Sequence, residues 1–222
     1  MFNVLSCLGD VLKLENLSKM RIISFEGLDK SGKHTQSNKL AEALRALGYK
    51  VVQSEFHRYD TPTGKLVQEY LYKRYDIDTI TAELLMLADK TAQQKWYKEL
   101  DEQGVDFLIL DRYIASQYVY GLAKGFSKDY MDILLGHITY QPTLQLYLDV
   151  SAETSMSRKG QHGDNDRYES DKELLEKVRL IYLDYFNESP NRVPIHEIDD
   201  LDVDTIHKLV KEKVFKYFSI AG

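Results

Sequence analysis

The feature that most constrains the fold is a short segment with two glycines that ends in a lysine. Residues 27–33 match the pattern G-x-x-x-x-G-K. The run before them, 21–26, is mostly apolar and β-rich, as in a buried parallel strand. Leu40, Leu44 and Leu47 follow at helical spacing. A strand, a loop and a helix in this order predict a P-loop. Its amides and helix start bind phosphate, and its lysine, Lys33, reaches the β- and γ-phosphates.

The rest of the chain alternates between β-like and helical patterns. Further strands are predicted at 51–56, 105–110, 143–150 and 194–198. Helices are predicted at about 79–99, at 172–186 and from 203 onward, and Ser151 is suited to cap another. Alternating strands and helices predict an α/β fold. We expect a P-loop NTPase-type three-layer sandwich, with a five-stranded parallel sheet and helices on both faces, in one domain over residues 20–222.

The last position of the P-loop motif departs from the usual pattern. His34 stands where Ser or Thr normally offers a hydroxyl group to Mg²⁺, and imidazole binds that ion less well than oxygen does. Three alternatives remain: Thr35 supplies the hydroxyl, water bridges the ion to the protein, or His34 faces away from the site. We favour the water-mediated arrangement.

A second candidate site lies at the end of the strand predicted at 105–110. Asp111 follows this strand, and an acid at the carboxyl end of a parallel strand lies beside the phosphate site. Its expected task is to position Mg²⁺ through water. Arg112 comes next, and its planar guanidinium group suits a phosphate oxygen because it can donate two parallel hydrogen bonds.

From Met20 almost to its end, the chain resembles the thymidylate kinases, a family of P-loop nucleoside monophosphate kinases. The P-loop, the segments 56–59 and 63–65, the acceptor motif 111–121 and a lid at about 158–169 occur in the family's order. The resemblance implies ATP-dependent phosphorylation of a deoxynucleoside monophosphate, with dTMP the best single candidate. It also implies Mg²⁺ as cofactor, a homodimer and a cytoplasmic enzyme of dTTP biosynthesis.

The resemblance also implies roles for individual residues. The expected catalytic set is Lys33, Asp29, Lys30, Arg112 and Asp111. The expected ATP- and phosphate-binding set is Gly27, Leu28, Asp29, Lys30, Ser31, Gly32, Lys33, His34, Thr35, Arg158 and Arg167. The expected acceptor-binding set is Asp29, Arg58, Met86, Lys90, Arg112, Ser116, Gln117, Tyr120 and Tyr168. Lys30 places a basic residue in the P-loop, whereas the lid core at 161–166 has no arginine, so the chain resembles the members whose P-loop supplies that charge.

The base pocket departs from the family pattern. Met86 and Lys90 stand where relatives have an aromatic residue that stacks on thymine and an arginine that points at it. Methionine can cover a ring, and lysine can donate to a base carbonyl, but neither reproduces the original geometry. Met86 is equally consistent with the core of an amphipathic helix. A kinase with a broader range of monophosphates, or a deoxynucleoside kinase, is therefore the first alternative.

Composition and the absence of other motifs exclude several alternative classes of protein. The formal net charge of −6 argues against a general nucleic-acid partner, and the single cysteine, Cys7, cannot form an internal disulfide. No apolar run approaches the length of a membrane span. The chain lacks the Asn-Lys-x-Asp guanine reader of P-loop GTPases, and His34 alone favours a non-catalytic nucleotide-binding module. We expect residues 1–19 to form a short helical or disordered extension, or to precede the native start.

Overall fold

The structure, a computed structural model, describes residues 19–158, 167–168 and 171–221. Residues 1–18 of the expected extension and the expected lid core, 161–166, lie outside the described residues. The strands are β1 (Arg21–Glu26), β2 (Val51–Glu55), β3 (Phe107–Asp111), β4 (Leu144–Leu148) and β5 (Arg192–Ile195). The helices are α2 (Lys33–Ala46), α3 (Pro62–Leu71), α4 (Thr79–Ala92), α5 (Gln94–Glu102), α6 (Ile114–Ala123), α7 (Lys128–Leu135), α8 (Ala152–Ser157), α9 (Lys172–Phe186) and α10 (Val203–Phe218).

The sheet has five parallel strands in the order β2-β3-β1-β4-β5. The central strand β1 pairs with β3 on one side, where Phe25 lies opposite Asp111, and with β4 on the other, where Glu26 lies opposite Tyr147. All carboxyl ends therefore meet at one edge, which is where α/β sheets bind their ligands. The predicted fold class is confirmed.

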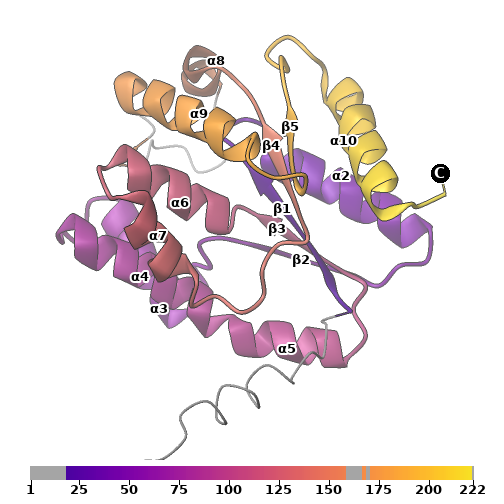
Figure 1. The fold of residues 1–222 in the computed structure, drawn as a ribbon, viewed down its shortest axis with the longest axis horizontal. Coiled ribbons are helices and arrows are strands. Elements are labelled where there is room, and N and C mark those ends of the chain that lie inside the picture. The colour runs from indigo at the N-terminus through magenta and orange to yellow at the C-terminus, as the bar shows by residue number, and fades with distance from the viewer. Residues whose placement is uncertain (1–18, 159–166, 169–170, 222) are drawn as a thin grey trace, which may run out of the picture.

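Helices cover both faces of the sheet (Figure 1). On one face, α2 and α10 pack against each other and against the strands. On the opposite face, α6 packs against α9 and α4, and α3 packs against α4. Buried strands such as Leu144–Leu148 read as continuous apolar runs because both of their faces are covered.

Two predicted boundaries were wrong. The helical region expected at 79–99 is two helices, α4 and α5, because Gln93 closes one helix and begins the next. The last strand is at Arg192–Ile195 and not at 194–198, because Gln145 donates its backbone amide to Asn191 and sets the register two residues earlier than expected. Ser151 caps α8 as expected, since its Oγ accepts from the Thr154 amide.

Within the part of the chain that the structure describes, no helix has both the length and the apolar character that a membrane crossing requires.

Candidate functional site

The P-loop connects β1 to α2 at the carboxyl edge of the sheet. Gly27 and Gly32 have φ values of 141° and 96°, and Lys30 also has a positive φ of 61°. A Cβ atom at Gly27 would come within 2.7 Å of the Leu148 carbonyl oxygen, so only glycine fits beside β4 there. The motif therefore has the strained, turned backbone from which amides can face an anion.

Lys33, at the start of α2, is 6% exposed and folds back over the loop. Its Nζ donates to the carbonyl oxygen of Leu28 at 2.7 Å, with longer contacts to the Gly27 carbonyl oxygen at 3.3 Å and to Ser31 Oγ at 3.4 Å. Burial, helped by the nearby Arg112, lowers the pKa of Lys33 to about 8. The ammonium group therefore lies inside the loop, in position to contact an incoming phosphate.

Two side chains, one on α8 and one directly after it, donate hydrogen bonds to backbone carbonyl groups of the P-loop. Ser155 Oγ donates to the Asp29 carbonyl oxygen at 2.8 Å, and Arg158 Nη1 donates to the Lys30 carbonyl oxygen at 3.2 Å. Arg158 Nη2 donates to the Asp199 carbonyl oxygen at 3.1 Å. Arg158 thus joins the P-loop to the segment after β5.

Arg112 lies at the end of β3 and contacts the P-loop directly. Its Nη2 donates to Asp29 Oδ1, and its Nη1 donates to Ser116 Oγ at 3.1 Å. Burial works to raise the pKa of Asp29, but Arg112 and Lys33 outweigh it and hold that pKa below its usual range. The pair places a carboxylate and a guanidinium group side by side between the P-loop and α6.

Glu26, the last residue of β1, is linked to Arg112 through Ser116. It is fully buried, and its Oε2 accepts from the Ser116 amide at 3.1 Å and from Ser116 Oγ at 2.6 Å. Tyr182 of α9 contacts the same Oγ atom at 2.9 Å. Burial raises the pKa of Glu26. A hydrogen-bonded chain therefore runs from Glu26 through Ser116 to Arg112.

The residues expected near a metal ion are more open. Asp111 is half-buried at the end of β3, and its carboxylate interacts electrostatically with Lys33. Thr35 and His34 are exposed on the first turn of α2. Among the described residues, no cluster of three His, Cys, Asp or Glu side chains is arranged to hold a metal ion. The described protein therefore offers single oxygen ligands to a metal ion, not a closed cage.

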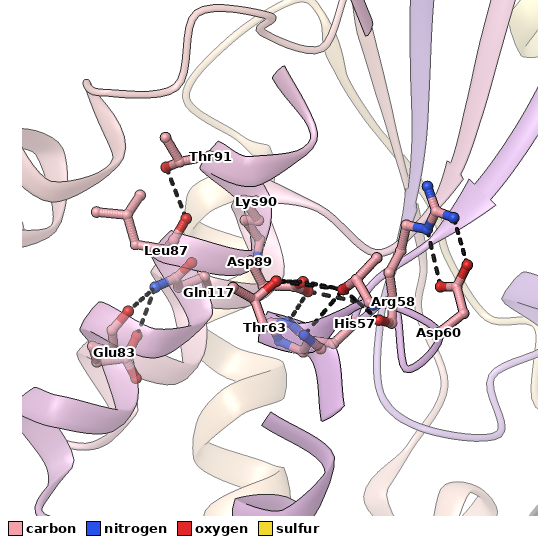
Figure 2. Close-up of polar contacts among 12 residues, drawn as sticks. His57, Arg58, Asp60, Thr63, Glu83, Leu87, Asp89, Lys90, Thr91 and Gln117 are labelled. Carbon is pink, nitrogen blue, oxygen red and sulfur yellow. Dashed lines mark hydrogen bonds and ion pairs between the residues drawn. The ribbon is translucent and has the colours of Figure 1, made fainter. Parts of the chain in front are cut away.

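A second polar group lies on α4 and α6 (Figure 2). Gln117 Nε2 donates to the Glu83 carbonyl oxygen at 2.8 Å and to Glu83 Oε2 at 3.1 Å. Lys124 Nζ forms a buried ion pair with Glu83 Oε1 at 2.8 Å. Lys90, on the same helix as Glu83, is 2% exposed, and its Nζ lies 5.2 Å from the centre of the Phe56 ring. Burial lowers the pKa of Lys90 to about 8.

Asp89 on α4 holds the segment between β2 and α3 (Figure 2). Its side chain is completely buried, and its Oδ2 contacts His57 Nδ1 at 2.9 Å and accepts from the Arg58 amide at 3.3 Å. Its Oδ1 accepts from Thr63 Oγ1 at 2.8 Å and from Thr61 Oγ1 at 3.3 Å. One carboxylate therefore fixes the whole turn that carries Arg58.

The guanidinium group of Arg58 is engaged within the protein. It pairs with Asp60 at 2.6 Å, donates to Gln93 at 3.1 Å and lies 4.8 Å from the Trp96 ring centre. To bind an acceptor phosphate, it would exchange the exposed Asp60 for that ligand.

The remaining predicted residues lie around α3, α4 and α6. Tyr120 faces Tyr168 with ring centres 5.5 Å apart, and Arg112 lies 5.9 Å from the Tyr120 ring. Met86 is 7% exposed and packs in a hydrophobic cluster between α3 and α4. Arg167 donates to the Tyr70 carbonyl oxygen and pairs with Asp76, so in this structure it lies beside the end of α3 and not beside the P-loop.

Four buried charged residues at the site were missed by the sequence analysis: Glu26, Glu83, Asp89 and Lys124. Their signal was available, since a charged residue inside an otherwise apolar strand or helix face needs a partner. Naming those partners requires knowing that α3, α4 and α6 meet.

Comparison with known proteins gives consistent matches along most of the chain. Residues 25–210 match the family described as thymidylate kinase. The human thymidylate kinase is 36% identical over 153 residues, which cover 67% of this chain and 69% of the human protein. The thymidylate kinase of Thermoanaerobacter sp. (strain X514) is 31% identical over 206 residues, or 90% of this chain and 99% of that protein. The solved structure of the Candida albicans thymidylate kinase, described as having broad substrate specificity, has a TM-score of 0.77 at 29% identity and covers 90% of this chain and 93% of that chain.

Proposed function

Because the chain belongs to the thymidylate kinase family and transfers a phosphoryl group from ATP to dTMP, giving dTDP, we propose that the residues around its P-loop form one active site with two halves. The donor half binds ATP and the acceptor half binds dTMP. The observation that carries the division is the contact between Arg112 and Asp29. It joins the end of β3, which faces the acceptor residues of α6, to the loop that faces the donor.

The donor half consists of the P-loop and its supports. Its backbone amides and Lys33 bind the β- and γ-phosphates of ATP, with Lys30 adding a charge near the transferred group. The set is Gly27, Leu28, Asp29, Lys30, Ser31, Gly32, Lys33, His34 and Thr35. Arg158 already contacts the P-loop backbone, and the resemblance assigns Arg158 and Arg167 to the donor nucleotide. For Arg167 this role requires it to leave Asp76.

The acceptor half binds dTMP between the segment after β2, α4 and α6. Arg112 and Arg58 bind its phosphate, and Asp29 contacts the sugar or its phosphate neighbourhood. Tyr120 packs on the deoxyribose and crowds a 2′-hydroxyl group. Ser116, Gln117, Lys90, Met86 and Tyr168 complete the pocket around the base.

Mg²⁺ fits this site as a weakly anchored ion. Magnesium keeps several waters and takes one or two carboxylates together with substrate phosphates, and the described residues offer such isolated oxygens in Asp111 and Thr35. Asp111 would hold the ion through water, and Thr35 is a second candidate ligand. When bound, the ion neutralises charge on the ATP phosphates.

The chemistry asked of the protein is alignment and charge neutralisation. The acceptor phosphate is dianionic near neutral pH, so no strong general base is needed. Lys33, Lys30 and Arg112 offset the repulsion between two anions that must come into line. Asp29, ionised beside Arg112, fixes the direction of that guanidinium group, and the lid residues exclude water.

The substrate assignment is tested by a panel of acceptors. Purified protein with ATP and Mg²⁺ is assayed by coupled detection of ADP with dTMP, dUMP, dCMP, dGMP and thymidine. We expect the highest kcat/KM with dTMP. Equal rates across the monophosphates would favour a broad deoxynucleoside monophosphate kinase, which the substitutions at Met86 and Lys90 make the second candidate. If thymidine were the only acceptor phosphorylated, both of these assignments would be contradicted and a deoxynucleoside kinase would be favoured.

The assembly and location are also proposals. Leu66 on α3 and Ile80 and Leu84 on α4 are about half exposed, which supports a homodimer through these helices. Light scattering of purified protein tests this directly. A reducing, cytoplasmic location is consistent with a chain whose single cysteine cannot form an internal disulfide, and the net charge of −6 gives no support for a nucleic-acid partner.

A further inference from the structure

A histidine near the expected acceptor residues Lys90 and Arg112 has one ring nitrogen bound to a buried carboxylate. His57 lies in the segment between β2 and α3, at the carboxyl edge of the sheet. Its Nδ1 is 2.9 Å from the buried Asp89, while its side chain retains 12% exposure. Within the described part of the chain, its Nε2 makes no hydrogen bond. The expected acceptor residues Lys90 and Arg112 are close enough to act electrostatically on the ring.

The protonation of this pair follows from its surroundings. Burial and the nearby Lys90 lower the pKa of His57 to about 4, so the ring is neutral near pH 7. Burial works to raise the pKa of Asp89, but its bonds from His57 and Thr63 outweigh it and hold that pKa below its usual value. An ionised carboxylate only accepts hydrogen bonds, so the single ring proton must be on Nδ1. Nε2 is then an acceptor with no proton of its own.

We propose that His57 determines specificity, with Nε2 accepting a hydrogen bond from an N–H or O–H group of the bound acceptor nucleotide, and that Asp89 positions it by fixing the tautomer. This inference rests on the proposed acceptor half of the site. Two groups of dTMP have the required chemistry: the N3–H of the base and the 3′-hydroxyl of the sugar. Lys90, which acts electrostatically on the His57 ring, supplies a donor, and a donor together with an acceptor complements the adjacent carbonyl and N–H of thymine, whereas cytosine presents them reversed.

The first test uses His57→Asn, whose amide N–H can replace Nδ1–H opposite Asp89 while nothing replaces Nε2. We expect KM for dTMP to rise about 3- to 10-fold, the range of one net hydrogen bond, with KM for ATP and the melting temperature close to wild type. His137→Asn, an exposed histidine outside the site, is the matched control and should change neither constant.

Two analogues identify the group that donates to Nε2. N3-methyl-dTMP lacks the base donor, and 3′-deoxy-dTMP lacks the sugar donor. The penalty of His57→Asn should disappear for one analogue and persist for the other. An equal penalty with all three acceptors, or no penalty with dTMP, would overturn the proposal.

A second measurement needs no variant and therefore does not depend on folding. Imidazole ¹⁵N spectra of the wild-type protein should show His57 protonated on Nδ1 and should show its Nε2 resonance moving upfield when dTMP is added without ATP. An Nε2 resonance that stays in place at saturating dTMP would rule out the contact. If the wild-type protein uses another monophosphate and not dTMP, the substrate assignment fails, and titration with that monophosphate still decides the role of His57.

Discussion

The guanidinium group of Arg112 donates to the carboxylate of Asp29, so the end of β3 is joined directly to the P-loop. Arg112 also donates to Ser116, which is bonded to the buried Glu26 at the end of β1. Three neighbouring elements of the fold therefore fix one planar cation between the two proposed phosphate sites. A planar cation with donors in two directions can hold its protein partners and still face a phosphate.

Replacing Arg112 with lysine should separate charge from geometry. Arg112→Lys keeps a positive charge but cannot donate to Asp29 and Ser116 together with a phosphate. We expect kcat/KM for dTMP to fall about 10- to 100-fold, corresponding to about 1.5–3 kcal/mol, with KM for ATP less affected. Arg21→Lys, at the opposite end of the sheet, is the control for a conservative change. Equal losses in the two variants would show that Arg112 has no special role.

Lys33→Ala should nearly abolish turnover while leaving the fold intact. Removing one cation from a preorganised phosphate site costs about 10²- to 10³-fold in kcat, or more. The melting temperature should change by a few degrees at most, because the buried ammonium group is itself costly to desolvate. Lys39→Ala, on the same helix but paired with Asp204, should retain wild-type kcat. Wild-type turnover in Lys33→Ala would contradict the mechanism.

Local patterns were sufficient to predict most of the fold. Isolated apolar runs such as Leu144–Leu148 and a motif such as the P-loop carry their own signal in consecutive residues. The short helices α3, α6 and α7 were not predicted. α6 is buried almost all round, so its sequence lacks the polar face that marks an amphipathic helix. The break at Gln93 was also missed because no Gly or Pro marks it.

The site was predictable where its residues are adjacent in sequence and not where they come from separate helices. Asp29, Lys33 and Arg112 follow strands whose order along one edge is implied by the fold. The contacts of Asp89 with His57, Arg58 and Thr63 span about thirty residues and depend on α3 packing against α4. No spacing rule in the sequence connects such positions, so these partners came only from the structure.

Lys90 should give the acceptor step a pH dependence. The Lys90 ammonium group loses its proton as the pH rises through its pKa, which burial lowers to about 8. The pKa of Lys33 is also about 8, so the assay uses saturating ATP, whose phosphates keep that ammonium group charged. Under these conditions we expect kcat/KM for dTMP to fall as the pH rises through about 8, because the neutral amine of Lys90 is the weaker donor. Lys90→Arg keeps its charge throughout this range and should remove the fall. The exposed Lys95→Arg should leave it unchanged. The same fall in Lys90→Arg would assign it to another group.

Gly64 tests whether the turn that carries Arg58 must keep its present shape. A Cβ atom at Gly64 would lie 1.8 Å from the Arg58 carbonyl oxygen and 2.3 Å from its carbonyl carbon, so the backbone itself would have to move. Gly64→Ala should therefore lower the free energy of unfolding by about 1–3 kcal/mol, the usual cost of overpacking a buried position.

The same displacement should reach the acceptor site and not the donor site. Arg58 is held by Asp89 through its amide and by Asp60 through its side chain, so pushing its carbonyl oxygen away disturbs both contacts. We expect KM for dTMP to rise more than KM for ATP, as measured by varying each substrate in turn. Lys65→Ala, the exposed neighbour on α3, should change stability by less than about 0.5 kcal/mol. If Gly64→Ala lost stability without a change in KM for dTMP, the turn would be structural only, and Arg58 would have no part in binding the acceptor.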